Sequence, residues 1–226
     1  MRLIVSGGGS GEESKEQDEL FASMLDKSKP LLYIPIARDT TEHSYSSCLE
    51  WLKSTFDKLG IKKYEMFDLN DIEKSGDVGP TNYSGIYIGG GNTPFLLKKL
   101  KESGFWEFLK RAIDADIPVM GGSAGAIILA KSIIPSLNHD MNWVELEDFS
   151  GIDCIGGWEI SCHYTSKEDS IIKKMINKNS MKKLVALTNR NGLYVSDEGF
   201  KLIGQESAYV FRDGKIKELK VGEFLK

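Results

Sequence analysis

Apolar runs typical of buried strands alternate with amphipathic segments typical of helices over most of this chain. The strand-like runs span residues 2–7, 30–37, 62–69, 83–91 and 117–122, and helix-like segments at 15–25, 46–60 and 92–116 lie between them. Nearly continuous apolar strands separated by helices are typical of a parallel sheet that carries helices on both faces. The sequence therefore predicts a doubly wound, mostly parallel α/β fold.

The pattern changes after residue 180. Short strands with turn signals follow at 183–188, 192–196, 200–204 and 207–219, and the last contains Asp213-Gly214, a dipeptide favoured in tight hairpins. We expect an antiparallel extension at the C-terminal side of the sheet. No linker, repeat or low-complexity segment interrupts residues 1–226, so we expect a single domain.

Composition excludes several classes of protein. The net charge is -4, whereas a nucleic-acid-binding domain is expected to show a clustered basic face. No apolar run approaches the roughly 18 residues that span a bilayer. The three cysteines lack CxxC spacing, and "MRLIVSGGG" lacks the pattern of a cleavable signal. We therefore expect a cytoplasmic protein with reduced thiols, no metal or other cofactor, and no nucleic-acid or membrane partner.

The segment Gly121-Gly122-Ser123-Ala124-Gly125 matches G-x-S-x-G, the pattern of a nucleophile elbow. A tight turn from strand to helix leaves no room for bulky flanking side chains, and it lifts the serine hydroxyl above the carboxyl edge of the sheet. The apolar run after Ser123 predicts a helix whose first N–H groups face a developing oxyanion. Ser123 is the candidate nucleophile, and a simple N-cap is the alternative.

An elbow serine needs a general base, and the chain has three histidines, His43, His139 and His163. His163 ends a strand-like run in which Glu159, Ser161 and His163 share the more polar face. In open α/β sheets, ligands bind at the carboxyl ends of strands, which makes His163 the best candidate base.

A third group should orient the histidine. Asp140 lies between the nucleophile and the base in the chain, and the same loop also holds Glu145, Glu147 and Asp148. A carboxylate of this loop is expected in the role, with Asp140 as the first candidate. The same aspartate also suits an ordinary turn.

A second glycine cluster, Gly89-Gly90-Gly91, ends the strand-like run before 92–116. It lacks the patterns of phosphate-binding and dinucleotide-binding loops. Hydrolases with an elbow take one oxyanion donor from the residue after the nucleophile and another from a neighbouring strand–helix loop. The backbone N–H groups of Ala124 and of the Gly90/Gly91 turn are therefore the expected donors, provided that the two strands are neighbours. A tight strand–helix turn capped by Asn92 or Thr93 is the alternative.

The runs "IYIGGGNTPFLLKKL", "GGSAGAIIL", "HDM" and "SCHYT" resemble the S51 serine peptidases, the family of aspartyl dipeptidases (dipeptidase E) and cyanophycinase, over nearly the whole chain. The resemblance implies a flavodoxin-like fold related to class I glutamine amidotransferases. It also implies Ser123, His163 and Asp140 as the catalytic residues and Gly91 and Ala124 as the oxyanion hole. This chain departs from the dipeptidase at Gly122, and at Thr188-Asn189-Arg190, where relatives tend to carry an acidic residue.

The resulting expectation is a serine peptidase that hydrolyses short peptides through an acyl-enzyme, as a dipeptidase-type exopeptidase with a preference for aspartyl substrates. Three alternatives stay open: a cyanophycinase-like β-aspartyl isopeptidase, another amidase on the same fold, and a non-catalytic relative that binds small molecules. A small peptide is the expected partner, and a homodimer is left open.

Overall fold

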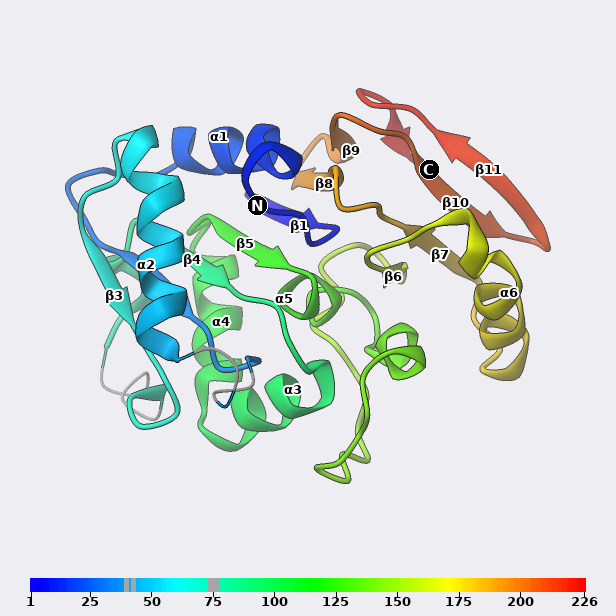
Figure 1. The fold of residues 1–226 in the computed structure, drawn as a ribbon, viewed down its shortest axis with the longest axis horizontal. Coiled ribbons are helices and arrows are strands. Elements are labelled where there is room, and N and C mark those ends of the chain that lie inside the picture. Colours follow the sequence, from blue (N-terminus) through cyan, green and yellow to red (C-terminus); the bar gives the residue numbers. More distant parts are fainter. Residues whose placement is uncertain (39–40, 42–43, 73–77) are drawn as a thin grey trace.

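Five adjacent parallel strands form one side of the larger sheet in the computed structural model, which describes residues 1–38, 41, 44–72 and 78–226 (Figure 1). The sheet has the strand order β12-β9-β8-β1-β5-β4-β2-β3. Its parallel strands are β1 (Leu3–Ser6), β2 (Leu31–Ile34), β3 (Tyr64–Met66), β4 (Gly85–Ile88) and β5 (Val119–Gly122). The antiparallel strands β8 (Asn191–Ser196), β9 (Gly199–Gly204) and β12 (Phe224–Leu225) continue it beyond β1.

Helices cover both faces of this sheet. On one face, Ile4 of β1 packs in one apolar cluster with Phe21 of α1 (Lys15–Ser23) and Phe56 of α2 (Tyr45–Phe56). On the other face, Leu3 and Val5 belong to the cluster that includes α3 (Thr93–Glu102), α4 (Phe105–Asp114) and α5 (Ala124–Ile127). Because side chains alternate along a strand, neighbours in β1 serve opposite faces. The doubly wound, mostly parallel fold is confirmed.

A second, smaller sheet has the order β11-β10-β7-β6. It consists of β6 (Glu159–Ser161), β7 (Lys183–Ala186), β10 (Ala208–Arg212) and β11 (Lys215–Leu219). Helix α6 (Asp169–Lys178) packs on it through Ile172 and Met175. Figure 1 shows this sheet and α6 on the side of the molecule away from α2. The expected antiparallel extension is thus divided between two sheets, and within the smaller one β6 and β7 are parallel.

The helices differ from the sequence prediction at two points, and the structure decides a third. The single helix expected over 92–116 is two helices, because Gly104 lies between them with a φ of 78°, outside the helical range. Of the two expected caps, it is Asn92 that caps α3, since its side chain accepts a hydrogen bond from the N–H of Phe95 at 2.9 Å. The helix after Ser123 ends at Ile127 rather than continuing through the whole apolar run.

Short 3-10 helices connect several of these elements, at Gly11–Glu13, Asp57–Leu59, Pro80–Asn82, Ile134–Asn138 and Ser166–Glu168. The Asp213-Gly214 turn joins β10 to β11 with positive φ at both residues, as expected for a tight hairpin. None of the helices that the structure describes combines the length and the apolar character needed to cross a membrane.

Candidate active site

A cavity of about 770 Å³ lies at the carboxyl ends of β1, β4 and β5. Ser123, which directly follows β5, and the glycine turns after β1 and β4 line it. Strand β5 pairs with β1 on one side and with β4 on the other. The two strands that precede the glycine turn and the elbow are therefore neighbours, as the oxyanion prediction required.

Ser123 occupies a strained turn. Its φ and ψ are 51° and -112°, a combination that a residue with a side chain rarely adopts. Neighbouring groups hold it there: its N–H donates to the carbonyl of Ser6 at 3.2 Å, and the Cys162 thiol lies 3.7 Å from its carbonyl oxygen. A Cβ on Gly121 or Gly125 would stand 2.2 Å from a backbone oxygen, so both glycines are needed for this close approach. Ser123 therefore lies in a tight, closely packed turn between β5 and α5.

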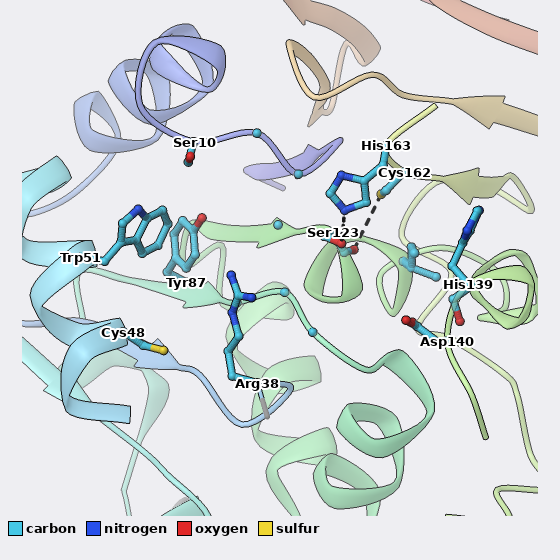
Figure 2. Close-up of a pocket in the computed structure, with 18 of the residues that line it drawn as sticks. Ser10, Arg38, Cys48, Trp51, Tyr87, Ser123, His139, Asp140, Cys162 and His163 are labelled. Atoms are coloured by element: carbon cyan, nitrogen blue, oxygen red, sulfur yellow. Dashed lines mark hydrogen bonds between the residues drawn. The ribbon is translucent and has the colours of Figure 1, made fainter. Parts of the chain in front are cut away.

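His163 reaches Ser123 from the smaller sheet. It lies just beyond β6, and its N–H donates to the carbonyl of Gly7 at 3.1 Å, which ties it to the turn after β1. The imidazole lies against Gly8, because a Cβ added to Gly8 would be 2.3 Å from the Cε1 atom of His163. The ring nitrogen Nε2 is 2.7 Å from Ser123 Oγ (Figure 2). The structure therefore brings together the nucleophile and the base that the sequence predicted.

The other ring nitrogen faces an amide. His163 Nδ1 lies 2.7 Å from Oδ1 of Asn189, in the connection between β7 and β8. Because an amide oxygen only accepts hydrogen bonds, Nδ1 carries the proton, and Nε2 is left to accept from the serine hydroxyl. The fully buried Asn191 shapes this connection: its side chain accepts from the N–H of Thr188 at 3.0 Å and donates to the carbonyl of Ser207 at 2.9 Å.

The prediction that Asp140 orients the histidine is wrong in this structure. The Asp140 carboxylate instead accepts from the N–H and the hydroxyl of Thr93, at 2.9 and 2.5 Å. Thr93 is the first residue of α3, where free N–H groups and the helix dipole attract a carboxylate. Asp140 does line the cavity, but Asn189 holds the position beside the imidazole.

The other candidates of the sequence analysis lie elsewhere. Asp148 pairs with Lys101 at 2.6 Å, and this pairing lowers the pKa of its carboxyl to about 2. Glu145 and Glu147 are exposed. His139 lines the cavity, but its Nε2 lies 3.0 Å from the carboxylate of Glu168. His43 is outside the described residues.

The second glycine turn lies directly against the serine. A Cβ on Gly90 would be 3.1 Å from Ser123 Cβ, and Gly91 has a φ of 143°. The N–H of the next residue, Asn92, donates to the carbonyl of Ala37 at 2.8 Å, which fixes the turn to the end of β2. Ala124 is the first residue of α5, so its N–H has no intrahelical partner. Ala124 directly follows the nucleophile, and the second glycine turn touches Ser123 through Gly90, while Gly91 lines the same cavity.

The wall away from His163 is aromatic and carries one cation. Tyr33, Tyr87, Cys48 and Trp51 line it together with Arg38. Burial raises the pKa values of the Tyr33 and Tyr87 hydroxyls and of the Cys48 thiol, so these groups are neutral near pH 7. Among the described residues, no cluster of three or more histidine, cysteine or acidic side chains is arranged to hold a metal ion.

The sequence analysis missed two residues of this site. Asn189 was noted only as a departure from an acidic residue in relatives, although that comparison placed it at a functional turn. Arg38 was not chosen, although it follows β2 at the same carboxyl edge as Ser123. A charged side chain directly after a buried parallel strand is the signal that could have identified it.

Comparison with known proteins agrees with this geometry. Residues 2–203 match the family model described as Peptidase family S51. The chain belongs to that family. Together with relatives named Peptidase E, this membership makes it a serine-type peptidase.

Individual S51 relatives are distant. The chain is 25% identical over 199 residues to a Peptidase E from Nostoc sp. strain PCC 7120, which covers 84% of this chain and 78% of the relative. A solved structure described as a Peptidase E protein from Listeria monocytogenes EGD-e has a TM-score of 0.70 at 21% identity and covers 91% of this chain and 98% of its own. A shorter match, 34% identical over 77 residues, is to the pyridoxal 5'-phosphate synthase subunit PdxT of Methanocorpusculum labreanum, covering 34% of this chain and 37% of the relative.

Proposed function

We propose that this S51 peptidase hydrolyses short peptides with Ser123 as nucleophile, His163 as general base and Asn189 as the residue that orients the base. The continuous chain of hydrogen bonds from Ser123 Oγ through the imidazole to Asn189 Oδ1, both at 2.7 Å, is the observation that carries the proposal. A histidine with a protonated Nδ1 offers the lone pair of Nε2 to the hydroxyl. A nucleophile, a histidine and a third orienting group form such a unit on unrelated folds, and in papain-like enzymes, whose nucleophile is cysteine, the third group is asparagine.

The reaction follows from this arrangement. Ser123 Oγ attacks the peptide carbonyl while His163 Nε2 takes its proton, and the N–H groups of Gly91 and Ala124 stabilise the oxyanion. Each such donor contributes about 3 kcal/mol in the transition state. The imidazolium then gives the proton to the leaving amine, which departs as the C–N bond breaks. Water, activated by the same nitrogen, cleaves the acyl-enzyme and restores the serine hydroxyl.

The proposed substrates are dipeptides, and we propose that the enzyme prefers those that contain an aspartyl residue. The resemblance to the aspartyl dipeptidase group and the name Peptidase E of several relatives support this choice. The cavity volume of about 770 Å³ is in the range of small-molecule sites, which suits a peptide of a few residues.

A fluorophosphonate probe tests the catalytic unit without any knowledge of the substrate. We expect the probe to label the wild-type protein at Ser123 and to leave Ser123→Ala unlabelled, while His163→Ala is labelled far more slowly. Ser54→Ala, on the exposed face of α2, serves as the control and should be labelled like wild type. Labelling that survives His163→Ala at the wild-type rate would contradict the role of the base.

Hydrolysis of Asp-Leu, β-Asp-Arg, Glu-Leu and Ala-Leu then tests the substrate. The proposal expects cleavage of Asp-Leu that depends on Ser123. Cleavage of β-Asp-Arg alone would favour an isopeptidase instead. If the probe labels Ser123 but no peptide is cleaved, the aspartyl preference is refuted while the catalytic unit stands.

A further inference from the structure

The cavity extends from Ser123 into a lobe lined by Tyr33, Cys48, Trp51 and Tyr87, which we call the aromatic lobe. Tyr33, Cys48 and Tyr87 are almost fully buried, and the exposed fraction of Trp51 is 38%. The rings of Trp51 and Tyr87 meet edge to face with centroids 6.1 Å apart. In Figure 2 the lobe lies on the opposite side of Ser123 from His139 and Asp140. It is a separate part of the site, and the proposed catalytic steps do not use it.

Arg38 is the cation of this lobe. Its backbone follows Ala37, whose carbonyl is fixed by Asn92, so the base of the side chain is held beside the Gly91 turn. Figure 2 shows the Arg38 guanidinium on the side of Tyr87 that faces Ser123. Its positive charge also acts on the Tyr33, Cys48 and Tyr87 groups, which agrees with a side chain that points into the lobe.

In the part of the protein that the structure describes, no acidic side chain pairs with this charge, and the neighbouring acids Asp39 and Glu42 lie outside that part. Within residues 1–38, 41, 44–72 and 78–226, no carboxylate forms an ion pair or hydrogen bond with the Arg38 guanidinium. Asp18 acts electrostatically on Tyr87, but its carboxylate accepts a hydrogen bond from Ser14 at 2.7 Å and does not line the cavity. The Arg38 side chain is exposed to the solvent that fills the cavity, so a ligand can reach it, and its planar fork matches both oxygens of a carboxylate.

We infer that Arg38 binds a carboxylate of the peptide substrate in the aromatic lobe. The inference rests on the proposed function, because it takes the ligand to be a peptide whose scissile carbonyl lies at Ser123. The carboxylate has two possible sources, an acidic side chain and the C-terminus of a dipeptide. Either source would favour short acidic or free-ended peptides over internal segments of a protein.

Binding to a protein that cannot turn over separates these sources. The background is Ser123→Ala, and the ligands are Asp-Leu, Asn-Leu and Asp-Leu amide, measured by isothermal titration calorimetry. Hydrogen bonds to charged groups predict that Asp-Leu binds about ten- to hundredfold more tightly than the analogue that lacks the anchored carboxylate. Weaker binding of Asn-Leu identifies the side chain, and weaker binding of the amide identifies the C-terminus. Adding Arg38→Met should abolish that difference.

The matched control is Arg111→Met in the same background, since Arg111 is an exposed arginine of α4 with its guanidinium over Phe108. It should bind all three peptides like the parent. The inference is overturned if Arg38→Met leaves the affinities unchanged, if it weakens all three peptides equally, or if none of them binds.

Fluorophosphonate labelling keeps this inference apart from the proposed function. Labelling of the wild-type protein reports on the serine and its base, whereas the calorimetric difference between the peptides reports on Arg38. If wild type is not labelled but the carboxylate preference depends on Arg38, the peptidase mechanism fails and the anion site stands. If wild type is labelled and no such preference exists, the mechanism stands and the Arg38 site is refuted.

Discussion

Replacing Gly8 with alanine should disable the site without disturbing the serine itself. The added Cβ would stand 2.3 Å from His163 Cε1 and 2.8 Å from Nε2, whereas ordinary carbon contacts begin near 3.4 Å. The imidazole would have to retreat by about 1 Å, which moves Nε2 out of good hydrogen-bond range of Ser123 Oγ. Loss of general-base catalysis typically costs about a hundredfold to ten-thousandfold in rate. We expect a decrease of that size in the rate of fluorophosphonate labelling and in kcat.

Gly11→Ala is the matched control. Gly11 also has a positive φ, 59°, but a Cβ there would meet nothing within 4 Å. It should therefore carry a backbone penalty of about 1 kcal/mol with no effect on the histidine. Circular dichroism melting would confirm that both variants fold. Labelling of Gly8→Ala as fast as that of Gly11→Ala would refute the reasoning, because it would show that the position of His163 does not matter.

Three further changes test other parts of the structure. Asn189→Asp places a negative charge beside the imidazole, and this charge favours the protonated form of His163. The acidic limb of the pH–kcat/KM profile should therefore move up by about one to three pH units. Asn189→Ala should lower kcat by roughly tenfold without that shift. Burial raises the pKa of the Asp18 carboxyl from 3.8 to about 7, so its contribution to stability is complete below pH 3.8 and is lost as the pH rises through 7. Asp18→Asn should therefore lose less free energy of unfolding than wild type between pH 4 and pH 8 in urea titrations, by at most about 4 kcal/mol. Asn92→Ala removes the cap of α3 and should cost about 1 kcal/mol of unfolding free energy, seen as a lower Tm. The three arguments would be contradicted by an unchanged pH–kcat/KM profile of Asn189→Asp, by a pH dependence of stability in Asp18→Asn equal to that of wild type, and by an unchanged Tm of Asn92→Ala.

The sequence predicted the features that depend on local pattern. The alternation of strands and helices determined the parallel sheet, because only a strand covered on both faces reads as a continuous apolar run. From that sheet, the position of Ser123 at a carboxyl edge followed directly. The neighbouring Gly91 turn required only that β4 and β5 pair, which they do.

The orienting residue could not be found in the same way. Asp140 is close to Ser123 in sequence and has the expected chemistry, but its carboxylate is already engaged by Thr93. Asn189 reaches the histidine because the chain leaves the smaller sheet after β7 and joins the larger one at β8. That crossing depends on how two sheets pack together, which no local sequence pattern encodes. In addition, an acidic residue was expected as the third group, so the amide of Asn189 was not considered for that role.

The division of the proposed catalytic residues between two sheets has a consequence for how this protein loses activity on heating. Ser123 belongs to the larger sheet, whereas His163 extends from the smaller one and is joined to the turn after β1 by a single backbone hydrogen bond to Gly7. A slight loosening of the contact between the sheets would separate the serine from its base while every helix and strand stayed intact. On heating, the protein should therefore lose activity at a lower temperature than the one at which it unfolds, and cooling should restore the activity. The rate of turnover would then report on the contact between the two sheets.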